Sequence, residues 1–303
     1  MEHGAAGIGT FAAFGEFDAA LGSAEALGVD SGATLVKLCV RDRRGERHFA
    51  TWSSPSTERV GELVSRLAPD RIGITGCGSA DILADIARPA ANPIEFDAWG
   101  RGANELLALS GLASEAPYLL VSIGTGTSAL RVEGSRVERV GGTALGGGTA
   151  LGLGYALTNC RSHDELSALA ARGNRGNIDL LISDIYAKNA IPIAGEATAA
   201  SFGKLARSLD ATEAGSALPA PAARREDLAA AIMVLVAENI ALIANASAKL
   251  AGVERIVYGG STLHDNPRIV ETVRLFSTVM GFEAIVLPRS GHAGALGAML
   301  LAA

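Results

Sequence analysis

Two hydrophobic patterns alternate along the first half of this chain. Apolar runs bounded by turn residues predict strands at 27–40, 46–52, 71–75, 93–97, 118–123, 128–132 and 136–140. Between them, apolar residues that recur every three or four positions predict helices over 57–67, 79–88 and 98–112. Strands that alternate with helices indicate a layered α/β protein.

The second half is richer in helical patterns. Helices are predicted over 148–158, from Ser162, over 177–186, over 226–251, from Asn266-Pro267 and at the C-terminus, with strands at 255–260 and 283–288. Ser162 and Glu165 have the spacing of a capping box. Residues 187–223 contain prolines and many alanines, which predicts mostly loop. Polar residues such as Glu238 and Asn245 interrupt 226–251, so a core helix is expected there rather than a membrane span.

The order of elements suggests a duplication. Strand, hairpin and strand followed by α/β structure occur once from residue 27 and again from 118. We therefore predict an N-terminal lobe over 27–117 and a C-terminal lobe over 118–303. Residues 1–26 are rich in glycine and alanine and carry acidic residues without a basic start, which predicts a flexible extension rather than a secretory signal.

Charge and cysteine content narrow the function classes. The 303 residues carry a formal net charge of −6, and the 26 Lys and Arg are scattered, so no nucleic-acid or membrane partner is expected. The three cysteines have no CxxC spacing, which gives no disulfide framework or zinc site. A cytoplasmic protein with a small-molecule partner is favoured.

One strand, "GVDSGATLVKLCV" at 28–40, is interrupted by polar residues. Asp30 ends the first half, and the turn Ser31-Gly32-Ala33-Thr34 offers N–H and hydroxyl groups to a phosphate. Asp30 would then hold Mg²⁺ directly or through a water. An ordinary hairpin, in which Asp30 and Ser31 serve only turn chemistry, explains this stretch equally well.

A second stretch, "LLVSIGTGTSALRV" at 119–132, repeats the arrangement with Gly124-Thr125-Gly126-Thr127-Ser128 between two strands. Two facing hairpins of this kind clamp nucleotide phosphates in actin-like and sugar-kinase-like proteins. No P-loop pattern occurs in the chain, and no GxGxxG follows a strand.

A third stretch, at 139–159, is dense in glycine and yet leads into a helix. Gly146-Gly147-Gly148-Thr149 runs directly into the apolar periodic segment, so its N–H groups are expected to converge on an anion at the helix N-terminus. Arg139 lies immediately upstream. A phosphate or nucleotide role is therefore favoured over a flexible loop.

These stretches resemble the type II pantothenate kinases, the group shared by staphylococcal and animal enzymes. The similar segments follow one another in the same order over roughly 27–301: "GVDSGATLVK", "EFDAWGRGANELL", "SIGTGTS", "RVGGTALGGGTALGLGYALT", "GNIDLLISDIY", "ASFGK", "IVYGGSTLHDN" and "GHAGALGAML". The resemblance implies a duplicated two-lobe, actin-like fold of the acetate and sugar kinase type, with the nucleotide cleft between the lobes. It also implies a homodimer that uses ATP and Mg²⁺ to phosphorylate the terminal hydroxyl of pantothenate, the first step towards coenzyme A.

The resemblance assigns roles to three charged residues. Glu95 matches the catalytic base, expected at a strand end beside the cleft, where Asp97 would face the same side. Arg139 matches an arginine that contacts both the substrate and the transferring phosphoryl group, and Asp30 the residue that orients Mg²⁺ or its water. From the residues alone, Glu95 is equally explained as a surface acid, whereas the motif around Arg139 favours the site over a strand-end surface arginine.

Further residues are implied as nucleotide contacts. The expected phosphate contacts are Gly32, Ala33, Thr34, Lys37, Thr125 and Ser128. The expected nucleotide loop consists of Gly147, Gly148, Thr149, Ala150 and Leu151, with His163 near adenine and Ser261 on the opposite wall.

Two departures from the family pattern leave alternatives open. Ala33 stands where the family hairpin usually has a second glycine, and its methyl group would resist a positive φ. The C-terminal "PRSGHAGALGAML" differs from the animal enzymes, so their substrate contacts do not transfer. A kinase or ATPase of the same fold with another alcohol or sugar as substrate, and a catalytically silent metabolite-binding regulator, both remain possible interpretations.

Overall fold

The computed structural model describes residues 8–12, 21–186, 196–207 and 223–302. Most of the expected N-terminal extension (1–7 and 13–20) and most of the expected loop (187–195 and 208–222) lie outside the described residues.

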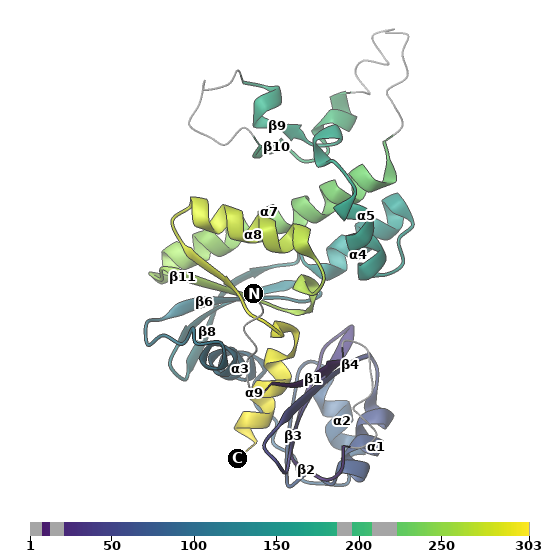
Figure 1. Cartoon of the computed structure of the whole chain (residues 1–303), viewed down its shortest axis with the longest axis vertical. Helices are drawn as coiled ribbons and strands as arrows, with labels where there is room; N and C mark the ends of the chain where they lie inside the picture. Colours follow the sequence, from purple (N-terminus) through teal and green to yellow (C-terminus); the bar gives the residue numbers. More distant parts are fainter. Residues whose placement is uncertain (1–7, 13–20, 187–195, 208–222, 303) are drawn as a thin grey trace.

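Two five-stranded sheets form the frame of the described chain (Figure 1). The N-terminal sheet has the order β1-β4-β3-β2-β5. Its strands are β1 (Ile8–Ala12), β2 (Ala24–Ser31), β3 (Leu35–Asp42), β4 (Arg47–Ser53) and β5 (Arg71–Thr75). The C-terminal sheet has the order β12-β11-β6-β7-β8. Its strands are β6 (Tyr118–Ile123), β7 (Thr127–Glu133), β8 (Arg136–Thr143), β11 (Arg255–Gly259) and β12 (Glu283–Val286).

The two sheets repeat one topology. β2, β3 and β4 form an antiparallel meander with β5 parallel to β2, and β6, β7 and β8 form the same meander with β11 parallel to β6. The predicted duplication is thus present in the strand order. It places the β2–β3 and β6–β7 turns at equivalent positions of the two sheets.

Helices cover the sheets in layers. α1 (Thr57–Leu67) and α2 (Ser79–Asp85) pack on the outer face of the N-terminal sheet. α3 (Glu95–Leu109) and α9 (Ala293–Leu301) lie between the two sheets, as Figure 1 shows. The far face of the C-terminal sheet is covered by α4 (Gly147–Thr158), α5 (His163–Ala171), α7 (Arg225–Ala251) and α8 (Pro267–Val279).

Strand β6 is apolar from Tyr118 to Val121 because both of its faces are covered. Leu119 and Val121 belong to the core under α7, whereas Leu120 belongs to the core around α3 and α9. Successive side chains of a strand point to opposite faces, so a strand covered on both sides needs apolar residues throughout.

The middle layer is packed backbone against backbone. A Cβ at Gly28 would lie 1.9 Å from Ala295 O, and a Cβ at Gly102 would lie 1.9 Å from Ala293 O. The glycines of β2 and α3 therefore let α9 approach both elements closely, which places the start of α9 beside the end of β2.

α7 is the helix predicted over 226–251. Among the described helices, it alone is long and apolar enough to cross a membrane, but 72% of its most apolar window is buried inside the molecule. Its position under the C-terminal sheet explains that burial, because its apolar side chains contribute to the largest core.

Several predicted elements differ in the structure. The strand expected at 93–97 is wrong, because α3 begins at Glu95, where Ala98 N–H already donates to Ile94 O. Two acidic residues in its first turn favour a helix start. The helix expected at 177–186 is also wrong. That stretch contains β9 (Leu180–Leu181), which pairs with β10 (Thr198–Ala200), and short 3-10 turns.

The expected flexible extension contains strand structure. β1 pairs in parallel with β4, and β2 begins at Ala24. Strand β1 was not predicted because the surrounding sequence is rich in glycine and alanine and shows no apolar pattern. It is defined by backbone pairing along the edge of β4. The lobe limits 27–117 and 118–303 stay a prediction, and α9 packs against β2, β3 and β5 although it lies at the end of the second segment.

Candidate functional site

The first hairpin joins β2 to β3. Gly32 N–H donates to Leu35 O at 3.0 Å, which leaves Ala33 and Thr34 exposed at the tip. Within the described chain, the N–H groups of Ala33 and Thr34 donate to no protein acceptor. Ala33 is not among the residues with positive φ, so its methyl group creates no backbone strain.

Asp30 is buried at the base of this hairpin, with 2% of its surface exposed. Lys37, its partner in the β2–β3 register, places Nζ 3.7 Å from Asp30 Oδ2. A Cβ at Gly294 would lie 2.5 Å from Oδ2, and a Cβ at Gly76 would lie 2.9 Å from Oδ1. Glycines therefore make room for the carboxylate, which lies near the N-terminus of α9, where the helix dipole favours negative charge.

Glu95 is the first residue of α3 and its side chain is exposed. Partial desolvation raises its pKa above the ordinary value, the negative charge of Asp30 raises it further, and Lys37 opposes both effects. The Glu95 carboxylate thus shares the electrostatic environment of Asp30 and Lys37. Asp97 was expected to face the same side, which is wrong, because residues two apart on a helix point in different directions.

The second hairpin, between β6 and β7, is fastened to its surroundings through its carbonyl groups. Gly147 N–H donates to Gly124 O at 2.8 Å and Gly148 N–H donates to Thr125 O at 2.9 Å. The hydroxyl of Thr262 also donates to Gly124 O, at 3.0 Å. The sequence analysis did not identify Thr262, because only its position after the Gly259-Gly260 turn connects it with this hairpin.

These bonds correct one expectation. The N–H groups at the start of α4 were expected to converge on an anion, but those of Gly147 and Gly148 are occupied by the second hairpin. Ala150 is wrong as a nucleotide contact, because its side chain is 0% exposed and its N–H donates to Gly146 O within the helix. The glycines serve close approach: a Cβ at Gly146 would lie 2.6 Å from Thr125 O.

The two hairpins meet at their tips. The hydroxyl oxygens of Thr34 and Thr125 lie 3.0 Å apart, although the residues are 91 positions apart in the sequence. Each hydroxyl comes from one of the two sheets, and both side chains are exposed. The structure therefore brings together the two stretches that were predicted separately to bind phosphate.

Arg139 lies on β8 and its side chain is exposed. A Cβ at Gly142 would lie 2.7 Å from the Arg139 guanidinium and 3.4 Å from the Cα of Ser128. The guanidinium is thereby placed beside the second hairpin, next to Ser128. A side chain at residue 142 would displace it.

The remaining predicted residues surround the start of α4. His163 begins α5, and its Cε1 would lie 3.1 Å from a Cβ at Gly147. Burial lowers the pKa of His163, so its imidazole is neutral at neutral pH, and its buried Nδ1 has no hydrogen-bond partner among the described residues. Ser261 follows Gly260, whose φ is +120°, in the turn that carries Thr262.

The capping box predicted before α5 is present with one difference. Ser162 Oγ accepts the Glu165 N–H at 3.1 Å, as expected. The Glu165 carboxylate accepts the N–H of Arg161 rather than that of Ser162. The box fixes His163 at the first turn of the helix.

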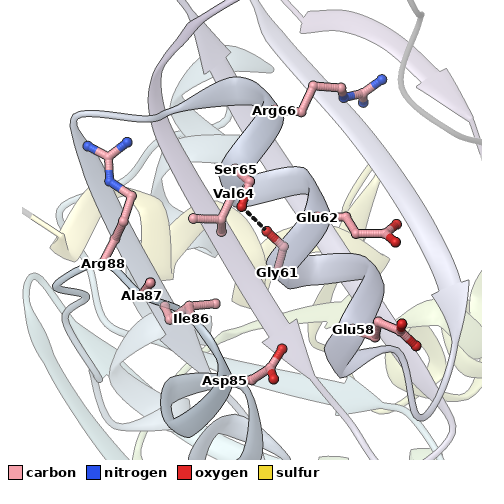
Figure 2. Close-up of a pocket in the computed structure, with 10 residues that line it drawn as sticks. All are labelled: Glu58, Gly61, Glu62, Val64, Ser65, Arg66, Asp85, Ile86, Ala87 and Arg88. Atoms are coloured by element: carbon pink, nitrogen blue, oxygen red, sulfur yellow. Dashed lines mark hydrogen bonds between the residues drawn. The ribbon is translucent and has the colours of Figure 1, made fainter.

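Two pockets lie on the described surface. One of about 430 Å³ is lined by Gly148, Leu151, Gly152, Tyr155, Cys160 and Arg161, so it adjoins the glycine-rich segment. The hydroxyl of Thr149, in the same segment, donates to Ala144 O. A larger one, of about 640 Å³, lies between α1 and the end of α2 on the outer face of the N-terminal sheet. Figure 2 shows Glu58, Glu62 and Asp85 at this larger pocket.

The donor groups at the two hairpins fit a magnesium nucleotide. Asp30 supplies a buried carboxylate whose only ion pair among the described residues is Lys37, and Thr34 and Thr125 supply hydroxyl oxygens. Oxygen ligands of this type are what Mg²⁺ prefers, with the phosphates and waters completing its shell. Lys37 and the unused N–H groups of Ala33 and Thr34 suit the phosphates.

Comparison with solved structures defines the class of protein first. The (R)-2-hydroxyglutaryl-CoA dehydratase component A of Acidaminococcus fermentans superposes with a TM-score of 0.59 at 17% identity, over 91% of this chain and 96% of that chain. A ROK family glucokinase of Streptomyces griseus, solved with glucose and AMPPNP, gives a TM-score of 0.54 at 15% identity, over 91% and 98%. The fold is therefore that of the actin-like kinases, as predicted.

Sequence similarity is more specific. The family model named Fumble matches residues 107–301. The type II pantothenate kinase of Oceanobacillus iheyensis is 36% identical over 275 residues, which cover 90% of this chain and 98% of that relative. The chain belongs to the type II pantothenate kinase family.

Proposed function

We propose that this protein phosphorylates pantothenate with ATP to give 4'-phosphopantothenate, the entry step of coenzyme A biosynthesis. The observation that carries the proposal is the meeting of the two hairpins at Thr34 and Thr125, with Asp30, Lys37 and Glu95 grouped on the side of the first hairpin. The relative from Oceanobacillus iheyensis is named a type II pantothenate kinase, and this name is the basis for proposing pantothenate as the substrate.

Glu95 acts as the general base in this proposal. It accepts the proton of the pantothenate hydroxyl as that oxygen attacks the γ-phosphorus of ATP, and ADP leaves. Its pKa is raised by desolvation and by Asp30. A raised pKa makes the ionised carboxylate a stronger base.

The hairpins hold the nucleotide. Asp30 would bind Mg²⁺ directly or through a water, and Mg²⁺, when bound, neutralises the charge that develops on the phosphates. Lys37, Thr34 and the N–H of Ala33 contact the phosphates from one sheet, and Thr125 and Ser128 from the other. Gly32 is needed because a Cβ there would lie 3.1 Å from Lys37 Nζ.

The base of the nucleotide lies near the start of α4. There the buried Nδ1 of His163 has no hydrogen-bond partner among the described residues, and Leu151 lines the adjoining pocket. Ser261 precedes Thr262, whose hydroxyl would lie 2.4 Å from a Cβ at Gly147. Arg139, beside Ser128, binds the pantothenate carboxylate or the transferring phosphoryl group with its planar guanidinium. A cytoplasmic homodimer completes the proposal.

A coupled ADP assay tests this function. Purified protein with MgATP is expected to release ADP only when pantothenate is added, and a panel of other small alcohols and sugars is expected to give no comparable stimulation. If ADP is released with another alcohol instead, that alcohol and not pantothenate would be the substrate. Nucleotide binding without ADP release for any member of the panel would make the protein a silent regulator.

A further inference from the structure

A cluster of possible metal ligands lies at the end of the N-terminal sheet opposite the first hairpin. β3 begins at that hairpin with Leu35 and ends at Asp42. There Asp42, Glu46 and His48 each offer one ligand atom, and these atoms all lie within 4.8 Å of one another. No step of the proposed phosphoryl transfer uses this cluster.

The β3–β4 register brings these residues together. His48 pairs with Val40, and Asp42 lies two residues beyond Val40, so both side chains lie on the same face of the sheet. Glu46 lies in the turn between the strands, with an exposed side chain that is free to move.

The Asp42 carboxylate is already oriented for a ligand. Its Oδ1 accepts the N–H groups of Arg44 and Glu46, both at 2.9 Å. This leaves Oδ2 directed at His48 Nε2, at 3.1 Å. These two atoms, one from each strand, are in hydrogen-bond contact, and a metal ion would replace that contact while the turn bonds keep the Asp42 carboxylate in place.

We propose that Asp42, Glu46 and His48 bind one divalent transition-metal ion of the zinc type, with water in the remaining position. One imidazole nitrogen and two carboxylate oxygens suit such an ion, whereas Mg²⁺ prefers oxygen ligands alone. Tetrahedral zinc places its ligand atoms about 3.3 Å apart. The pair of Asp42 and His48 already meets this spacing, and a rotation of the exposed Glu46 side chain completes it.

Binding would fasten the end of β3 to β4. β4 also pairs with β1, so the ion would stabilise the edge of the N-terminal sheet by mass action. The site takes no part in the proposed phosphoryl transfer, so its test is separate from the test of the kinase activity.

The experiment uses full-length protein without an affinity tag, dialysed against EDTA and then against metal-free buffer. Zn²⁺ is titrated by calorimetry, and Co²⁺ binding is followed by its visible absorption. One ion per chain is expected. Glu46→Gln and His48→Gln should each weaken Zn²⁺ binding by roughly tenfold or more, since even indirect partners of a metal contribute that much.

His264→Gln is the matched control. His264 lies 3.5 Å from Asp265, and this pair belongs to no three-residue ligand group in the described part of the chain. Its replacement should leave Zn²⁺ binding unchanged. Circular dichroism verifies that each variant is folded, and Glu46→Gln retains a folded test if His48→Gln does not. Equal Zn²⁺ affinity in wild type and Glu46→Gln, or an equal loss in His264→Gln, would overturn the proposal.

Discussion

The two hairpins occupy equivalent places in the two sheets, yet they differ in chemistry. The first has a buried carboxylate and a lysine at its base and two unused N–H groups at its tip. The second has hydroxyl residues, and its carbonyl groups accept hydrogen bonds from Gly147, Gly148 and Thr262. One topology therefore provides a charged side and a braced side.

The difference shows how a duplicated fold divides its work. Phosphoryl transfer depends on positioning and on charge stabilisation rather than on covalent chemistry. The first hairpin supplies the charges, and its tip is left free for a ligand. The second supplies a fixed wall, because the start of α4 and the turn at Thr262 hold it in place. The predictions below test this division.

The largest effect is expected on the charged side. Glu95→Gln should lower turnover by roughly 10²–10⁴-fold, the usual contribution of a positioned general base, while MgATP affinity is retained. The coupled ADP assay measures the first quantity and calorimetry the second. Asp97→Asn is the control, because Asp97 lies on a different side of α3 and should keep near wild-type turnover.

The same residue sets a pH dependence. Only ionised Glu95 accepts a proton, and its pKa lies above the ordinary value. Activity is therefore fully present above that raised pKa and falls as the pH is lowered through it. Turnover of Glu95→Gln should lack this acid limb, and an unchanged acid limb in that variant would assign it to another group.

On the braced side, Arg139→Ala should raise the KM for pantothenate and lower kcat together. A charge-assisted hydrogen bond contributes about 1.5–3 kcal/mol, which corresponds to a loss of roughly 10–100-fold in kcat/KM. Arg136→Ala is the control, because Arg136 lies on the same strand and pairs with Glu138 at 3.4 Å. Unchanged pantothenate kinetics in Arg139→Ala would remove Arg139 from the site.

The close packing of the glycine-rich segment against the second hairpin is tested by substituting two glycines of that segment. Gly146→Ala should lower the free energy of unfolding by about 1–3 kcal/mol, because its Cβ would lie 2.6 Å from Thr125 O and 2.7 Å from Gly126 Cα. In Gly152→Ala nothing lies within 4 Å of the new Cβ, and alanine favours a helix interior, so a gain of up to about 1 kcal/mol is expected. Urea unfolding compares them, and equal effects would contradict the brace.

The smallest effect is expected at the tip of the first hairpin. The backbone of Ala33 does not have a positive φ, so Ala33→Gly should leave MgATP affinity nearly unchanged. It should lower the free energy of unfolding by about 0.4–1 kcal/mol, because glycine makes the unfolded chain more flexible. Titration of MgATP into both proteins measures this. A tenfold gain in affinity, about 1.4 kcal/mol, would show that the methyl group obstructs the site and that the first hairpin is weakened in this chain.

Much of the fold was predictable because its information is local. Turn residues located both hairpins, and the periodic apolar residues located α1, α7 and the final helix. Boundaries failed where two patterns compete. Glu95 follows an X-Pro-Ile sequence that suggests an extended strand, whereas the burial of Ala98, Trp99 and Ala103 on one helix face decided for α3.

The candidate site was predictable as a set of residues but not as an arrangement. The sequence indicated Asp30, Lys37 and the glycine-rich segment, because charges and glycines inside apolar strands need a reason. It did not indicate Thr262, and it assigned Ala150 to the nucleotide although that residue is buried in the core.

The sequence by itself determined the two hairpins, the duplicated order of strands and the family, because turn chemistry and residue patterns act over a few neighbouring positions. Only the tertiary structure decided that Thr34 meets Thr125, that the N–H groups of Gly147 and Gly148 brace a hairpin instead of binding an anion, and that α9 lies between both sheets. Those features depend on which distant backbones approach closely enough to exchange hydrogen bonds, and no local pattern specifies that approach.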